Sequence, residues 1–121
     1  MPALSSCGET AATNSFQGEE HEVAARISNF QKHVTEASQK KICQEDLAAS
    51  LTRRIETSGK GCEEALKEQL KDVEDLTLTV QDVTVNGKNA TATVRSIRNG
   101  IAKPSTLALV KEGQAWRISG L

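Results

Sequence analysis

Residues 76–94 read LTLTVQDVTVNGKNATATV, and this pattern determines the fold that we expect for the chain. Apolar and polar side chains alternate along it, which is typical of strands with one buried face. The apolar residues of its first half are Leu76, Leu78, Val80, Val83 and Val85. They change parity after Val80, which predicts a β-bulge near Asp82. Asn86-Gly87 predicts a tight hairpin turn, so residues 89–94 are expected to form a second, antiparallel strand.

Two further strands are expected downstream of this hairpin. Asn99-Gly100 marks a turn, and a third strand covers about Ser105–Lys111. Glu112-Gly113 turns the chain again before a last strand at Ala115–Ser119. The C-terminal part of the chain is therefore predicted to be an antiparallel meander.

Amphipathic helices are expected upstream of the sheet. The first begins at about Glu19, the second carries Cys43 and ends at Ser58–Gly61, and the third begins at Cys62. Apolar residues recur in each at spacings of three or four, as on the buried face of a helix. They are Val23, Ile27, Phe30, Val34 and Ala37, then Cys43, Leu47, Leu51 and Ile55, then Ala65, Leu66, Leu70 and Val73. Helices followed by a meander of about four strands predict an α+β fold.

Three C-terminal segments carry a resemblance to a known family. They are Asn89–Val94, Leu107–Gly113 and Trp116–Ile118, and together they resemble the strands of small bacterial NTF2-like domains (cystatin-like superfamily). The resemblance covers about Glu19–Leu121. It implies a cone in which N-terminal helices pack on the concave face of a curved antiparallel sheet, and members of this kind are often extracytoplasmic lipoproteins. The fold alone does not choose between an enzyme, a binding protein and a scaffold.

Cys7 gives a second resemblance, which concerns location. It lies in Leu4-Ser5-Ser6-Cys7-Gly8, which resembles a bacterial lipobox, where the cysteine becomes the lipidated N-terminus of the mature protein. Only Met1–Ala3 precede Leu4, whereas a secretory signal needs a basic and an apolar region. A trimmed signal, a misassigned start and an accidental match, which would leave the domain cytoplasmic, all stay open. Residues 1–18 are predicted to be a flexible tether to a domain at 19–121.

The other two cysteines are Cys43 and Cys62. If lipid occupies Cys7 in an exported protein, an even pair remains in an oxidising compartment, which predicts a disulfide between them. The alternative is two buried thiols that pack as small apolar side chains. A metal site is not expected, because there is no Cys-x-x-Cys spacing and neither histidine is near in sequence.

Composition argues against several classes of function. The net charge is −1, the basic residues are scattered, and the chain has no Tyr and only Phe16, Phe30 and Trp116 as aromatic residues. A nucleic-acid surface is therefore not expected. No apolar run is long enough to cross a bilayer, so membrane attachment is expected only through lipid on Cys7. No motif for a cofactor is present, and none is expected.

Few residues are candidates for catalysis. Enzymes that share the NTF2-like fold place a carboxylate, histidine or tyrosine inside the cone, and this resemblance makes Asp82 and His33 the candidates. Asp82 is expected to be solvated at the bulge, and His33 to be a partly exposed helix residue at the edge of the apolar stripe. His21 lies near the predicted tether and is expected to be idle. No catalytic residue is therefore expected.

A ligand pocket is the other candidate site. Small side chains at Ala90 and Ala92, in the middle of the sheet, leave room under the helices, and ligand sites are mostly concave and apolar. Phe30, His33 and Trp116 are the other residues expected to line this space. The alternative is that Phe30 and Trp116 fill it as ordinary core residues.

Three functions follow from these expectations. The first is a non-catalytic, membrane-tethered NTF2-like domain that binds a small apolar ligand or a protein partner. The second is a small NTF2-like enzyme of the isomerase, dehydratase or cyclase type. The third is a structural module that forms a homodimer through its sheet, although the outward-facing threonines and Arg95 are too polar for an obligate interface.

Overall fold

The computed structural model describes residues 16–73 and 75–120. The helices are α1 (Glu19–Thr35), α2 (Gln39–Lys41), the π-helical turn η2 (Ile42–Asp46), α3 (Ala49–Glu56) and α4 (Cys62–Leu70). The strands are β1 (Leu76–Asn86), β2 (Asn89–Arg98), β3 (Ile101–Glu112) and β4 (Ala115–Gly120). The predicted α+β order of helices before strands is thus confirmed.

The strands form one antiparallel sheet in the order β1-β2-β3-β4. The predicted bulge is present: Val80 pairs with Val94 and Asp82 pairs with Thr93, which leaves Gln81 without a partner on β2. This extra residue restores the alternation, so that Val80 and Val83 are both buried. The sheet therefore keeps one apolar face along the whole of β1.

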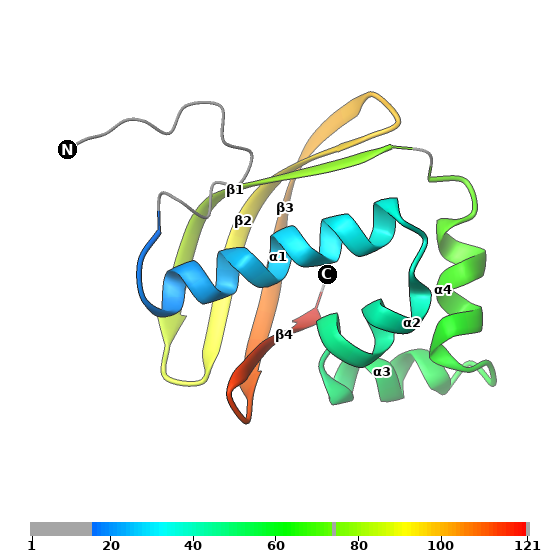
Figure 1. The fold of residues 1–121 in the computed structure, drawn as a ribbon, viewed down its shortest axis with the longest axis horizontal. Helices are drawn as coiled ribbons and strands as arrows, with labels where there is room; N and C mark the ends of the chain where they lie inside the picture. Colours follow the sequence, from blue (N-terminus) through cyan, green and yellow to red (C-terminus); the bar gives the residue numbers. More distant parts are fainter. Residues whose placement is uncertain (1–15, 74, 121) are drawn as a thin grey trace.

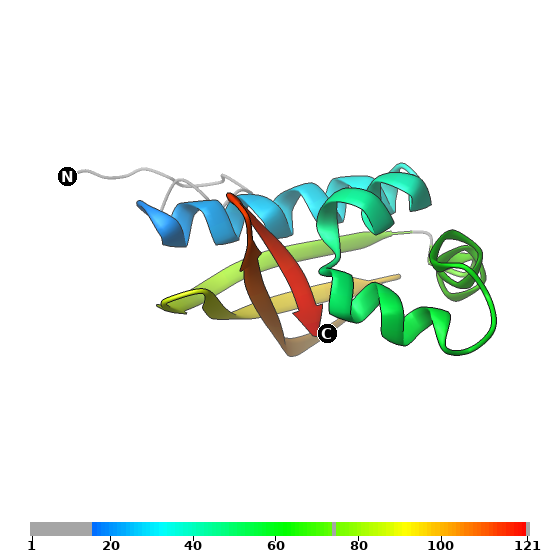
Figure 2. The same ribbon diagram turned by 90° about the horizontal axis from the view of Figure 1, so that it is seen from below.

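Helix α1 runs across that apolar face of the sheet, while α3 and α4 lie at one end of it (Figures 1 and 2). We call the face under α1 the helical face and the opposite one the outer face. The core lies between α1 and the helical face, and its fully buried members include Val23, Ile27, Val94, Leu109 and Ile118. The outer face carries exposed polar residues, among them Thr79, Thr91, Thr93, Arg95 and Thr106. This matches the sheet alternation expected from the sequence.

The single helix predicted over Cys43–Ile55 is divided in the structure. η2 ends at Asp46, and Leu47 has an extended backbone (φ −96°, ψ 140°). Leu47 forms a parallel bridge with Ile118 of β4, and the Ala48 N–H donates to the Ile118 carbonyl at 2.8 Å. Pairing with β4 offsets the helical hydrogen bonds lost at this point. The prediction of one continuous helix is wrong here. Leu47 and Leu51 are buried although Leu47 is not helical, so their apolar four-residue spacing does not require a helix.

The predicted disulfide between Cys43 and Cys62 is present, with the two Cα atoms 6.1 Å apart. It joins η2 to the first residue of α4, with α3 lying between them in the chain. A structural disulfide indicates an oxidising, extracytoplasmic environment. Within the described residues, no helix is long and apolar enough to cross a membrane. Cys7 lies outside the described residues.

Candidate functional site

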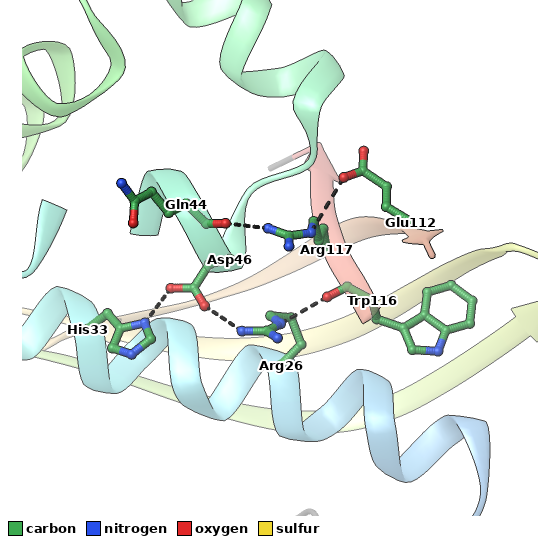
Figure 3. A network of polar contacts seen from close by, with 7 residues as sticks. All are labelled: Arg26, His33, Gln44, Asp46, Glu112, Trp116 and Arg117. Carbon is green, nitrogen blue, oxygen red and sulfur yellow. Dashed lines mark hydrogen bonds and ion pairs between the residues drawn. The ribbon is translucent and has the colours of Figure 1, made fainter. Parts of the chain in front are cut away.

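Asp46 is the most unusual residue of the structure, because its carboxylate is completely buried. Arg26 donates from Nη1 to Oδ1 at 2.8 Å, and His33 contacts Oδ2 through Nδ1 at 2.6 Å (Figure 3). A buried carboxylate is stable only when it is paired and hydrogen-bonded. Both of its oxygens meet that condition here.

The two partners of Asp46 come from one face of α1. Arg26 and His33 are seven residues apart, which is about two helical turns, so both side chains point toward the end of η2. Arg26 also donates from Nε to the Trp116 carbonyl at 2.9 Å. One guanidinium thus ties α1 to η2 and to β4.

Arg117 is a second cation that links η2 to the strands. Arg117 donates from Nη1 to the Gln44 carbonyl at 2.6 Å and lies 3.5 Å from Glu112 Oε1 (Figure 3). The other oxygen of Glu112 accepts the Ala49 N–H, at the start of α3, at 3.0 Å. Polar contacts therefore hold η2 and α3 in place against β3 and β4, where the predicted helix is interrupted.

The chemistry open to the pair of His33 and Asp46 is limited by these contacts. When Asp46 Oδ2 accepts the hydrogen bond, His33 donates it from Nδ1, and this fixes the tautomer with the proton on that nitrogen. This is how a carboxylate orients a general base. In the described part of the chain, however, no hydroxyl or thiol is hydrogen-bonded to His33, whose side chain is 10% exposed. Within residues 16–73 and 75–120, the arrangement provides a base and its orienting group, with no nucleophile bonded to the base.

The other predicted catalytic candidates lie away from this pair. Asp82 is exposed and sits beside the bulge, between the buried positions Val80 and Val83. His21 lies in the first turns of α1 and is partly buried, about three turns from His33. Neither residue is brought into contact with Asp46, which the sequence analysis did not single out.

The residues predicted to line a pocket are placed in or against the core. Ala90, Ala92 and Trp116 are buried members of the core cluster, and Phe30 packs against it. His33 is the fifth, and the expectation that it is partly exposed is wrong: it is buried, because its ring is hydrogen-bonded to the buried Asp46. The surface hollows given by the described residues are lined by other side chains, so the pocket under α1 stays a prediction.

Trp116 combines its core position with a polar contact. Its Nε1–H donates to Glu19 Oε1 at 2.7 Å, and Lys111 Nζ lies 2.7 Å from Glu19 Oε2 and 6.0 Å from the indole centroid. The hydrogen bond from Lys111, and after it the one from Trp116, lowers the pKa of Glu19 below its ordinary value of 4.5. These contacts fasten the start of α1 to β3 and β4.

Two of the hollows on the described surface bear on ligand binding. One, of about 440 Å³, lies on the β2–β3 hairpin and is lined by Ser96, Arg98, Asn99, Ile101, Lys103 and Ser105. The other, of about 530 Å³, lies beside the disulfide and includes Gln44, Thr52, Glu56, Glu63 and Glu64. Among the described residues, no group of three His, Cys, Asp or Glu side chains is placed to hold a metal ion.

Comparison with known proteins gives the fold and no closer relationship. No family model matches the chain, and no curated protein does. Among solved structures, it is similar to a designed protein whose title begins Rd1NTF2_05, at a TM-score of 0.53 and 18% identity over 83% of this chain and 95% of that one. It is also similar to a Campylobacter jejuni protein provisionally named NTF2-like transpeptidase (TM-score 0.51, 15% identity, 77% and 93% covered).

A third similar structure is a de novo designed protein with a curved β-sheet, at a TM-score of 0.51 and 17% identity over 80% of this chain and 93% of that one. At these identities the likeness concerns architecture alone. The helices on a curved four-stranded sheet, together with these three neighbours, show that this chain has the NTF2-like fold.

Proposed function

We propose that this chain is a non-catalytic NTF2-like binding domain that is held outside the cytoplasmic membrane by lipid on Cys7. Its partner is a small ligand or another protein. The disulfide between Cys43 and Cys62 supports the extracytoplasmic location. The lipobox-like sequence around Cys7 supports the anchor.

The observation that carries the non-catalytic part of the proposal is the pairing of Asp46. It is the one fully buried ionisable side chain among the described residues, and both its oxygens are bonded within the protein. A carboxylate that itself acts as the acid or base needs an oxygen that reaches the substrate. The fully buried side chains of the core are otherwise aliphatic, among them Ile27, Ile42 and Leu109. We therefore assign Asp46 a structural role.

The binding part of the proposal concerns the surface rather than the interior of the cone. Ala90 and Ala92 contact a closed core, in which Trp116 is also buried. The hollows beside the disulfide and on the β2–β3 hairpin have volumes in the range of small-ligand sites. These are the places where the domain can receive a ligand without unpacking.

The anchor is tested in cells that express the gene with its natural upstream sequence. Labelling with an alkyne analogue of palmitate is expected to mark the wild-type protein and to be lost in Cys7→Ser, which cannot carry the lipid. The Cys43→Ala/Cys62→Ala variant controls for cysteine reactivity and is expected to keep the label. Equal labelling of wild type and Cys7→Ser would refute the anchor.

One observation favours the alternative of a small NTF2-like enzyme, namely the orientation of His33 by Asp46 at 2.6 Å. The Campylobacter jejuni neighbour is named for transpeptidase activity, which requires a nucleophile as well as a base. His33→Asn separates the two functions, because its amide keeps a donor near the position of Nδ1 and removes the imidazole base.

The test is complementation of a deletion strain, compared at equal amounts of folded protein. A binding domain predicts that His33→Asn restores the wild-type phenotype. An enzyme predicts loss of the phenotype in His33→Asn. Asp82→Asn is the control for the loss of an exposed charge, since Asp82 lies outside the network.

A further inference from the structure

The helical face of the sheet changes character along the β2–β3 hairpin. Val94 and Leu107 are buried in the core on this face. Two residues further toward the turn on each strand stand Ser96 and Ser105, both partly buried. Beyond them the same face carries exposed side chains, including Arg98 and Lys103. The tip of this hairpin extends away from α1 (Figure 1).

These residues face one another across the two strands. Ser96 is opposite Lys103, and Arg98 is opposite Ile101, so Arg98 and Lys103 are diagonal neighbours on one face. Diagonal neighbours of this kind lie about 7–8 Å apart, close enough for one ligand to touch both. They border the hollow of about 440 Å³ described above, which we call the hairpin hollow.

The charges of the hairpin hollow are unbalanced. No ion pair involves Arg98 or Lys103 among the described residues, and no described residue that lines the hollow carries a carboxylate. Two like charges at this separation repel each other, and an anion between them would relieve the repulsion. The Ser105 hydroxyl adds a hydrogen-bond donor beside the two cations, whereas the Ser96 hydroxyl donates to the Lys103 carbonyl at 3.2 Å.

An exposed apolar side chain completes the hollow. Ile101 is 72% exposed and is the one large hydrophobic residue that stands out in this way among the described residues. It is paired with Arg98 across the two strands and stands two residues from Lys103 on β3, and it lines the hollow. A ligand that matched these residues would carry a negative charge and an apolar portion together.

The hollow is held in shape by its turn. Asn99 and Gly100 form the two-residue turn with positive φ values of 50° and 86°. Asn99 donates from Nδ2 to the Asp72 carbonyl at 2.9 Å, and its Oδ1 accepts the Asp75 N–H at 3.1 Å. The Asn99 N–H also donates to the Asp75 carbonyl at 2.9 Å. A turn fastened in this way loses little entropy when a ligand binds.

We infer that the hairpin hollow binds a small organic anion, a carboxylate or phosphate monoester with an apolar chain. Arg98 and Lys103 hold the charged group, with a hydrogen bond from Ser105, and the chain lies against Ile101. This inference rests on the proposed function in that it names the ligand class of the binding domain. Arg98 supplies a planar fork that suits two oxygens of one anionic group.

The experiment titrates octanoate into the full chain carrying Cys7→Ser and follows backbone amides by ¹H–¹⁵N NMR. The expected result is saturable shifts confined to residues 96–105. Arg98→Gln/Lys103→Gln is expected to weaken binding by at least about tenfold, the loss of charge-assisted hydrogen bonds. Lys88→Gln/Arg95→Gln removes the same charge from the β1–β2 turn and the outer face, and is expected to bind as the wild type does.

Three results would overturn the inference. The first is the absence of saturable shifts with octanoate, and the second is equal affinity in the two double variants. The third is binding to phosphatidylglycerol vesicles without binding of free octanoate, which would make the hairpin a membrane contact rather than a ligand site. Failure of the proposed function is measured by other experiments, namely palmitate labelling and the phenotype of His33→Asn, so the two failures can be distinguished.

Discussion

Asp46 is fully buried, and its two carboxylate oxygens are bonded to the Arg26 guanidinium and to the His33 ring. Such pairs rarely add much net stability, because both charges lose their hydration. Breaking one is costly, since the remaining partner is left buried without compensation. Arg26 and His33 retain some access to solvent, at 19% and 10% of their side chains, which limits that cost.

We predict that Asp46→Ala lowers the free energy of unfolding by about 3 kcal/mol, at the lower end of the range for a broken buried pair. Equilibrium unfolding in urea measures it. Asp82→Ala removes the same group from an exposed position and is expected to change stability by less than about 0.5 kcal/mol. A cost for Asp46→Ala no larger than that of Asp82→Ala would show that the network is not structural.

Glu19 gives a pH-dependent prediction at the same scale. Its pKa is lower in the folded protein than the ordinary value of 4.5, because Lys111 and Trp116 donate to the carboxylate. A lowered pKa means that the contact stabilises the fold above this ordinary value and is lost as the pH falls through the folded-state pKa. We therefore expect Glu19→Gln to lower the melting temperature at pH 7, and the difference from wild type to shrink toward pH 3.

Circular dichroism at a series of pH values measures this difference. Glu20→Gln is the matched control, because Glu20 lies in the same first turn and has the same relation to the helix dipole. Its effect is subtracted to isolate the contacts of Glu19. A difference between Glu19→Gln and wild type that stays constant from pH 7 to pH 3 would contradict the prediction.

Single residues also show where sequence reasoning stopped. Asp82 is a catalytic candidate only through the family resemblance and is expected to be solvated at the bulge, and its exposure in the structure agrees with this expectation. Asp46 was missed because the apolar spacing around it fits an unbroken helix, in which a polar residue draws no attention. The signal that was present is on α1, where Arg26 and His33 share a face at the edge of the apolar stripe. Two potential cations beside a buried stripe require an acceptor from another segment.

At the scale of elements, alternation predicted the sheet well and helical spacing predicted the helices less well. The alternation of apolar residues along β1 changes parity at Gln81 because one extra residue is inserted in this strand. An insertion of this kind changes the local sequence pattern, so the bulge can be predicted from the sequence. The helix break at Leu47 depends on the pairing of Leu47 with Ile118, which is 71 residues away in the chain. The sequence around Leu47 contains no pattern that indicates this pairing. Local patterns specify local geometry, whereas this break is a tertiary effect.

The disulfide is the strongest link between elements, and it closes a loop with a sequence separation of 19. In the chain-entropy account, a loop of about this size stabilises the fold by about 3 kcal/mol. We expect Cys43→Ala/Cys62→Ala, in a Cys7→Ser background, to lose about this amount in urea unfolding. Reductant is expected to bring the parent to the same stability and to leave the double variant unchanged. If reductant has no effect on the parent, the crosslink does not contribute.

For the whole molecule, the architecture could be predicted from the sequence because it depends on the order of two periods, helical and then alternating. The candidate sites could not be predicted in the same way. Arg26 and Trp116, which meet beside Asp46, are 90 residues apart in the chain. The hairpin hollow forms where the sheet extends away from α1, and the position of α1 on the sheet cannot be predicted from the spacing of residues in the sequence.

The polarity of the outer face leads to a prediction about assembly. Exposed residues on it include Thr79, Thr91, Thr93, Arg95 and Thr106. Stable homodimer interfaces have an apolar centre and few charges there. The large exposed hydrophobic residue, Ile101, lies on the hairpin turn and on the other face of the sheet. We therefore expect the Cys7→Ser chain to be a monomer of about 13.0 kDa by light scattering at micromolar concentration.

Removing Cys7 in this measurement prevents crosslinked dimers, which would otherwise imitate assembly. Measurements in low and high salt serve as the control, because association through scattered charges weakens as screening increases. A mass near twice the monomer value that persists on dilution and in high salt would contradict the prediction. It would mean that the threonine-rich face is buried in a homodimer, and the sheet would then be the binding surface of the domain in place of its hollows.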